Sequence, residues 1–162
     1  SDDIVRASSS RAPEAGPAAS ALALIAHMPG LSIRMLSIGV GLSHAATVRL
    51  VDRLAAEGLV ERREHFTDGR TRSLYLTAAG KVASDEVLSS RDEVIAEGLS
   101  ILSPDELRVL CDIAERVLRH RLENLEHSYR ICRLCCYEGC TNCPIDAELH
   151  ERGVDRENGG EA

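Results

Sequence analysis

LSHAATVRLVDRLAAEGLVERREHFTDGRTRSLYLT, residues 42–77, is the stretch that decides the fold. Ser43 is a favourable helix N-cap, because its hydroxyl can accept a hydrogen bond from a backbone N–H of the first turn. An apolar face follows at helical spacing, formed by Thr47, Leu50, Val51 and Leu54. Gly58 stands where a glycine in the left-handed region would stop the helix. These features predict one helix over residues 43–57.

Two short runs after this helix predict a β-hairpin. Residues 59–63 and 73–76 are partly alternating, and the polar loop between them contains Asp68-Gly69-Arg70. Upstream, residues 31–40 are expected to form another helix, and Gly41 is the turn at which a small residue lets two helices approach. This order is typical of a winged helix-turn-helix. The expected fold class is therefore mainly α, with a small β-hairpin wing and long dimerisation helices.

At these residues the chain resembles the MarR family of bacterial transcriptional regulators. The shared pattern lies at residues 42–43, 49–54, 58–62, 68, 70 and 76–80. The resemblance covers about residues 20–125 and implies a DNA-binding regulator, interpreted as a repressor. It also implies a homodimer that binds a palindromic operator in double-stranded DNA. No nucleophile–base constellation or phosphate-binding loop is visible in the sequence, so we expect no enzymatic activity.

DNA contacts are expected from the helix that begins after Ser43 and from the hairpin loop. The N-terminal half of such a helix meets base edges in the major groove. There Arg49 can donate twice to guanine or bind a phosphate, whereas His44 contacts a phosphate or nothing. In the family, the Asp of Asp-x-Arg orients an Arg that enters the minor groove, and these roles fall on Asp68 and Arg70. The expected DNA-binding residues are Ser43, His44, Ala45, Val48, Arg49, Arg53, Asp68, Arg70 and Arg72.

The composition is typical of a helical protein, and the net charge alone does not identify its binding partner. The 162 residues include only four aromatic side chains, so the core must be aliphatic, which suits packed helices. The net charge of -7 is unevenly distributed, because residues 43–72 contain six arginines against five acidic residues. On charge alone, this mixture favours an ordinary solvated helix surface. The family pattern favours a DNA-reading surface instead.

Residues 77–125 are expected to form two antiparallel helices of a dimerisation arm. The buried seam of the first helix is predicted at Val82, Leu88, Val94, Ile95, Leu99 and Leu102. Ser103, Pro104 and Glu106 then provide an N-cap, a proline at the first position and a capping box for the second helix. Its predicted apolar face is Leu107, Leu110, Cys111, Ala114, Val117, Leu118 and Leu122. Cys111 is interpreted as a small core hydrophobe.

CRLCCYEGCTNCP, residues 132–144, carries five of the six cysteines. Such a cluster in a cytosolic protein favours metal binding over disulfides. The expected ligands are Cys132, Cys135, Cys140 and Cys143, with Cys136 as a possible substitute. An iron–sulfur cluster, 4Fe–4S or 2Fe–2S, is favoured because the run is compact and ends in Cys-Pro. Zinc and thiol redox chemistry are the alternatives.

Three functions follow from this combination. The favoured hypothesis is a MarR-type regulator whose iron–sulfur cluster senses redox state, oxygen, nitric oxide or iron. The second is a MarR-type regulator with structural zinc that is controlled by a small ligand. The third belongs to another class, a small iron–sulfur or metal-handling protein that does not bind DNA.

The chain divides into five expected segments. These are a flexible N-terminal segment (1–19), the DNA-binding region (20–80), the helical arm (81–130), the cysteine segment (131–144) and an acidic tail expected to be disordered (145–162). No apolar run approaches the roughly 20 residues that span a membrane. No basic start followed by an apolar signal segment is visible. We therefore expect a cytoplasmic protein with no membrane partner.

Overall fold

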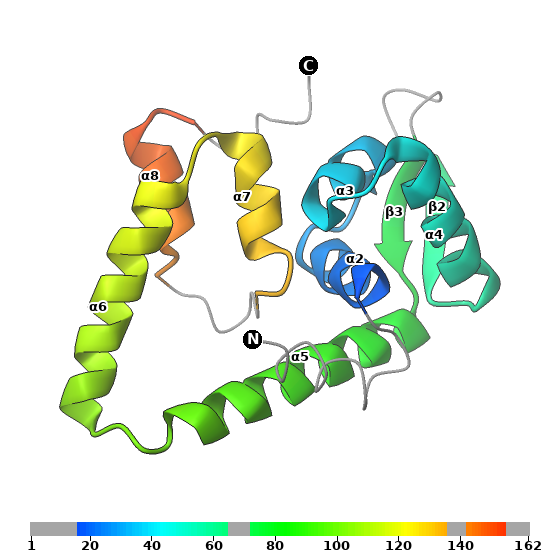
Figure 1. The fold of residues 1–162 in the computed structure, drawn as a ribbon. Coiled ribbons are helices and arrows are strands. Elements are labelled where there is room, and N and C mark those ends of the chain that lie inside the picture. The colour runs from blue at the N-terminus through cyan, green and yellow to red at the C-terminus, as the bar shows by residue number, and fades with distance from the viewer. Residues whose placement is uncertain (1–15, 65–71, 136–141, 155–162) are drawn as a thin grey trace.

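The structure is a computed structural model that describes residues 16–64, 72–135 and 142–154. It is mainly helical with one small sheet, as the sequence predicted (Figure 1). The elements in chain order are α2 (Pro17–His27), β1 (Leu31–Ser32), α3 (Ile33–Val40), α4 (His44–Ala56), β2 (Val60–Glu64), β3 (Arg72–Leu76), α5 (Ala78–Leu99), α6 (Pro104–Arg121), α7 (Leu125–Cys132) and α8 (Pro144–Glu151).

Helices α3 and α4 form the helix-turn-helix, and each begins at a serine cap. The Ser32 hydroxyl accepts from the Met35 N–H at 3.2 Å, and the Ser43 hydroxyl accepts from the Ala46 N–H at 3.3 Å. Between them Gly41 adopts the left-handed conformation with φ of 70°, which glycine takes without a Cβ penalty. The predicted turn at Gly41 and the predicted helix after Ser43 are therefore confirmed.

The sheet has three antiparallel strands in the order β1-β3-β2. Strands β2 and β3 are the predicted hairpin, and Arg62 is opposite Leu74 in their register. Strand β1 was not predicted, because two residues carry no alternation that a sequence pattern could reveal. It takes Leu31 and Ser32 from the predicted first helix, which therefore begins at Ile33.

One apolar core joins α2, the helix-turn-helix, the sheet and the start of α5. Its fully buried members include Leu22, Leu36, Val51, Leu54 and Leu74. Of the predicted inward face of α4, Thr47, Val51 and Leu54 are buried. Leu50 is only partly buried and packs against the edge of this core. Helix α2 begins at Pro17, so residues 17–19, which were expected to belong to a flexible segment, are helical.

Helix α5 packs on α2 through small side chains rather than through the predicted large ones. Its buried residues are Gly80, Ala83, Ser84, Val87 and Ser90. The predicted seam is wrong, since Val82 is 58% exposed and its other five members are only partly buried. Small residues on the contact face let the two helix axes lie close together.

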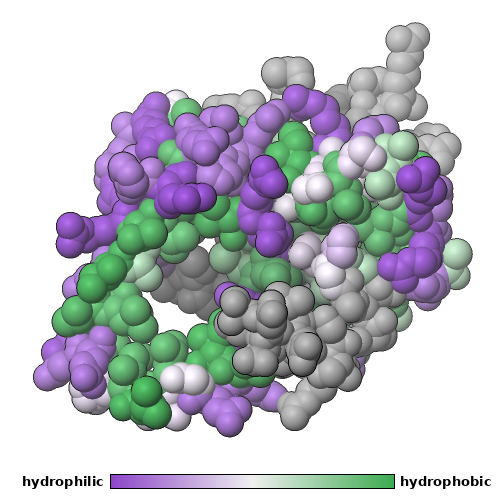
Figure 2. Space-filling model, viewed as in Figure 1, coloured by the Kyte–Doolittle hydropathy of each residue, from purple (hydrophilic) through white to green (hydrophobic). Residues whose placement is uncertain are grey.

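Helix α6 leaves its apolar face uncovered. The prediction of antiparallel packing is wrong, because α5 and α6 diverge from the turn that joins them (Figure 1). No residue of α6 is buried, and the exposed apolar side chains include Val109, Leu110, Ile113, Val117 and Leu118. Cys111 is exposed as well, so it is not a core residue of the single chain. Figure 2 shows apolar side chains along this helix.

The chain after α6 folds back instead of continuing the arm. Leu122 has extended backbone angles, and the Asn124 side chain then caps α7 by accepting from the His127 N–H at 2.8 Å. Helix α7 lies beside α3, and α8 lies beside α6 (Figure 1). The expected disorder from residue 145 is wrong for residues 145–151, which belong to α8. The helical arm, expected over residues 81–130, is interrupted at residues 122–124, between α6 and α7.

None of the helices in the described residues is both long enough and apolar enough to span a lipid bilayer.

Candidate nucleic-acid interface and cysteine-bearing segment

The N-terminal half of α4 presents a solvent-facing surface. His44, Ala45 and Arg49 are exposed, and Val48 is partly buried. The opposite side of the same helix is fixed in the core by Thr47, Val51 and Leu54, which are 0% exposed. Thr47 also donates from its hydroxyl to the Ser43 carbonyl at 3.0 Å, which stiffens the first turn. The predicted contact residues of α4 therefore share one rigid, accessible face.

Two ionic contacts connect α4 with its surroundings. Asp52 of α4 pairs with Arg62 of β2 at 2.7 Å, so the exposed face is held at a fixed angle to the wing strands. Arg53 pairs with Glu57 one helical turn later at 3.2 Å. This pairing would compete with the phosphate contact expected of Arg53. Arg49 makes no hydrogen bond or ion pair with the described part of the chain.

The wing is described only at its strands. Arg63 lies over the ring of Tyr75, with 4.4 Å from its guanidinium carbon to the ring centroid. The predicted minor-groove residues Asp68 and Arg70 lie outside the described residues. Arg72 pairs with Glu64 in the strand register, and its side chain is outside the described part.

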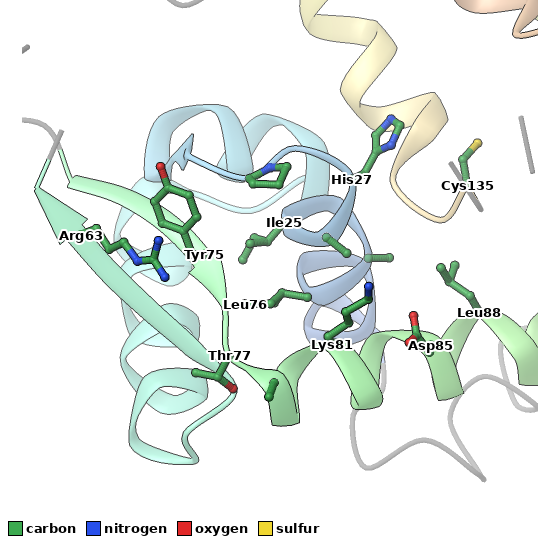
Figure 3. A pocket seen from close by; sticks show the side chains of 14 residues that line it. Ile25, His27, Arg63, Tyr75, Leu76, Thr77, Lys81, Asp85, Leu88 and Cys135 are labelled. Atoms are coloured by element: carbon green, nitrogen blue, oxygen red, sulfur yellow. The ribbon is translucent and has the colours of Figure 1, made fainter. Parts of the chain in front are cut away.

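A cavity of about 480 Å³ lies between α5 and the unit formed by α2, the helix-turn-helix and the sheet (residues 17–76), which is called the DNA-reading head below. Lys81, Asp85 and Leu88 line it from α5, while Arg63 and Tyr75 line one end (Figure 3). The opposite end contains two residues from distant parts of the chain, His27 and Cys135 (Figure 3). The cavity combines apolar walls with two cationic side chains and one carboxylate. No local sequence pattern marks this cavity, because its residues come together only through the packing of α2, β3, α5 and the segment after α7.

Three of the predicted metal ligands approach one small apolar cluster. Cys132 at the end of α7 is 4% exposed and packs with Leu122, Ile145 and Leu149. Cys135 and Cys143 are partly buried against the same cluster. Cys136 and Cys140 lie outside the described residues. Within the described residues, no three His, Cys, Asp or Glu side chains are grouped as ligands for a metal ion.

Helix α8 is attached to α6 and to the bend that follows α6 by an ionic network. Glu148 accepts from Arg119 of α6 at 2.8 Å and from Arg152 at 2.8 Å. Arg119 also pairs with Glu151. The hydrogen bond from Arg119, which has the largest effect, and the hydrogen bond from Arg152 hold the pKa of the Glu148 carboxyl below its ordinary value of 4.5. Arg152 donates to the Leu122 carbonyl at 2.9 Å, so the network closes the bend between α6 and α7.

Comparison with known proteins gives consistent matches to one family. A model of the MarR family matches residues 15–71. The uncharacterised HTH-type transcriptional regulator YdgJ of Bacillus subtilis is 29% identical over 105 residues, which are 65% of this chain and 63% of YdgJ. The transcriptional repressor MprA of Escherichia coli is 34% identical over 91 residues, 56% of this chain and 51% of MprA. The match thus spans less than two thirds of either relative.

A solved structure shows the same fold. The MarR family protein Rv2887 of Mycobacterium tuberculosis, in complex with salicylic acid, has a TM-score of 0.57 and 22% identity. The similarity covers 72% of this chain and 85% of that one. At this level of identity the likeness concerns the fold.

Proposed function

We propose that this chain is a winged helix-turn-helix transcriptional regulator of the MarR family, and that it binds double-stranded DNA as a repressor through α4 and the wing. The observation that carries this proposal is the exposed N-terminal half of α4. Its Arg49 is available to a partner, and its inner side is anchored in the core. Because the helix is already fixed to the core, it can place its exposed side chains in the major groove without first becoming ordered itself.

The direct test is salt-dependent binding to duplex DNA. Arg49→Ala should weaken binding about 5- to 150-fold, the range for losing a base or phosphate contact of about 1–3 kcal/mol. Arg108→Ala is the matched control, because Arg108 is an exposed arginine on α6 that pairs with Asp105 at the surface. Binding to no duplex at any salt concentration would favour the metal-handling class instead.

We also propose that the active species is a homodimer that binds a palindromic operator. The support is the stripe of exposed apolar residues on α6, which one chain alone leaves in water. Exposed apolar patches of this kind mark association surfaces. A twofold dimer implies half-sites about one helical turn apart, which is roughly 34–36 Å along B-form DNA.

The cysteine segment is proposed to hold an iron–sulfur cluster that senses redox state, oxygen, nitric oxide or iron, with structural zinc as the alternative. Five cysteines in residues 132–143 provide the soft donors that both groups require. Cys132, Cys135 and Cys143 already border one apolar cluster. The remaining ligand would come from Cys140 or Cys136. When bound, an iron–sulfur cluster would supply a group whose charge depends on its oxidation state.

Composition of the isolated protein decides between these two groups. We expect a brown protein with iron and acid-labile sulfide after anaerobic purification. A colourless protein with one zinc per chain would support the alternative. Purified protein that contains neither would contradict both.

A second candidate function is control by a small organic ligand, and the cavity beside α5 favours it. Its apolar walls suit a planar or aliphatic body, and Lys81 and Arg63 suit an anionic group. Lys81→Ala should then reduce the release of DNA by an aromatic carboxylate, while binding of DNA without the ligand stays unchanged.

A further inference from the structure

Helix α7 packs along the first helix of the helix-turn-helix. Tyr129 is 2% exposed. A Cβ added at Gly39 would lie 3.5 Å from the Tyr129 Cβ and 3.5 Å from its carbonyl oxygen. Helix α7 thus meets α3 at ordinary van der Waals distance, while the tightest neighbour of that Cβ is Leu24 of α2, whose Cδ2 would be 2.3 Å away. Gly39 therefore lies where α2 and α7 both pack on α3.

The contact extends along α3 toward the recognition helix. At one end, Arg34 of α3 pairs with Glu126 of α7 at 2.9 Å. At the other end, the turn residue Gly41 lies near Arg130, since a Cβ added there would be 3.7 Å from the Arg130 Nη2. Helix α7 thus touches α3 from its first turn to the bend that leads into α4.

The other neighbour of α7 is the cysteine-bearing cluster. Cys132 lies three residues after Tyr129, one helical turn away. Its side chain packs with Leu122, Ile145 and Leu149. The Cys135 N–H donates to the Cys132 carbonyl at 3.0 Å and continues the chain toward the other cysteines. Eight residues are too few for a stable isolated helix, so α7 depends on packing against both neighbours.

We infer that α7 is a positioning element of the DNA-reading head. It docks on α3 through Tyr129, and it transmits the chemical state of Cys132 to α3 and so to α4. A group that makes the Cys132 side chain larger or charged cannot stay in the apolar cluster, and α7 then loses one of its two supports. The effect of α7 on DNA binding rests on the proposed function, whereas the docking of α7 on α3 can be measured without DNA.

Amide hydrogen exchange on the full chain tests the inference with two pairs of variants. Tyr129→Ala removes the docking side chain, and Tyr129→Phe keeps the ring as its control. Cys132→Asp imitates the charge of an oxidised thiol inside the cluster. Its control is Asn142→Asp, which adds the same charge at an exposed site in the same segment.

Tyr129→Ala and Cys132→Asp should each increase the amide exchange rate of residues 33–40 at least about tenfold. The exchange rates of β2 and β3 should stay unchanged. In both control variants, the exchange rate of residues 33–40 should be close to that of the unmodified chain. Unchanged exchange of α3 in either variant would overturn the inference. Equal acceleration in β2 and β3 would overturn it too, because the effect would then be general loss of the fold. If α3 responds while binding to duplex DNA does not, the docking stands and the proposed function fails.

Discussion

The DNA-reading head buries its apolar side chains within one chain, whereas helix α6 exposes its apolar side chains to solvent. In the head, Leu22, Leu36, Val51, Leu54 and Leu74 are at most 3% exposed within a single chain. In α6, Val109, Ile113 and Val117 are at least 50% exposed, although their spacing is equally regular. The core of the head is buried within one chain, whereas no described residue of the same chain covers the exposed apolar face of α6.

The buried apolar residues of the head should therefore determine folding stability, and the exposed ones of α6 should determine association between chains. Burial of apolar surface provides roughly 25 cal/mol per Å², so the head gains this energy on folding and α6 gains it only on association. Variants in the head should therefore change unfolding, and variants on the α6 face should change the oligomeric state. The following predictions test that division.

The largest effect is expected from two charges on the α6 face. Ile113→Asp with Val117→Asp should convert a dimer into a folded monomer, because a buried interface would have to desolvate both carboxylates. Sedimentation velocity measures the mass, and circular dichroism measures the retained helix. Arg108→Gln with Arg121→Gln changes the net charge equally outside the apolar stripe and should leave the dimer intact. A dimer that survives the aspartates would place the interface elsewhere.

Two glycines of α5 should respond in opposite directions. A Cβ at Gly80 would lie 1.9 Å from the Leu59 carbonyl oxygen, which is backbone and cannot move aside. Gly80→Ala should therefore lower the free energy of unfolding by at least about 3 kcal/mol. Nothing lies within 4 Å of a Cβ at Gly98, so Gly98→Ala should raise it by about 0.5–1 kcal/mol. Urea unfolding measures both, and equal effects would contradict the described contact of α5 with the head.

The smallest effect concerns the attachment of α8 at low pH. The pKa of Glu148 is lowered by Arg119 and Arg152, so its ionic network stabilises the docked helix above the ordinary carboxyl pKa of 4.5. That contribution is lost as the pH falls through the lowered pKa. The protection factors of the amides in residues 144–151, which correct each exchange rate for its intrinsic pH dependence, should therefore decrease as the pH falls below the ordinary carboxyl pKa of 4.5, and Glu148→Gln should remove this decrease. Identical pH profiles would show that the network does not hold α8.

The sequence predicted the head more completely than the rest, for physical reasons. Ser43, Gly41 and the apolar spacing of α4 act within a few residues, and local rules describe them well. The contacts of α5 were mispredicted because tight packing on α2 selected Ala83 and Ser84 over larger residues. The docking of Tyr129 on Gly39 and the cavity beside α5 join segments far apart in sequence. No spacing rule can reveal such contacts before the fold is known.

Selection of duplex sequences from a random pool by the purified full chain tests the central claim most directly. The account predicts enrichment of a twofold-symmetric sequence, with half-sites about 10 base pairs apart from centre to centre, that Arg49→Ala no longer recovers. Recovery of no sequence above background, or of the same sequence by Arg49→Ala, would contradict the assignment of α4 as the DNA-reading helix.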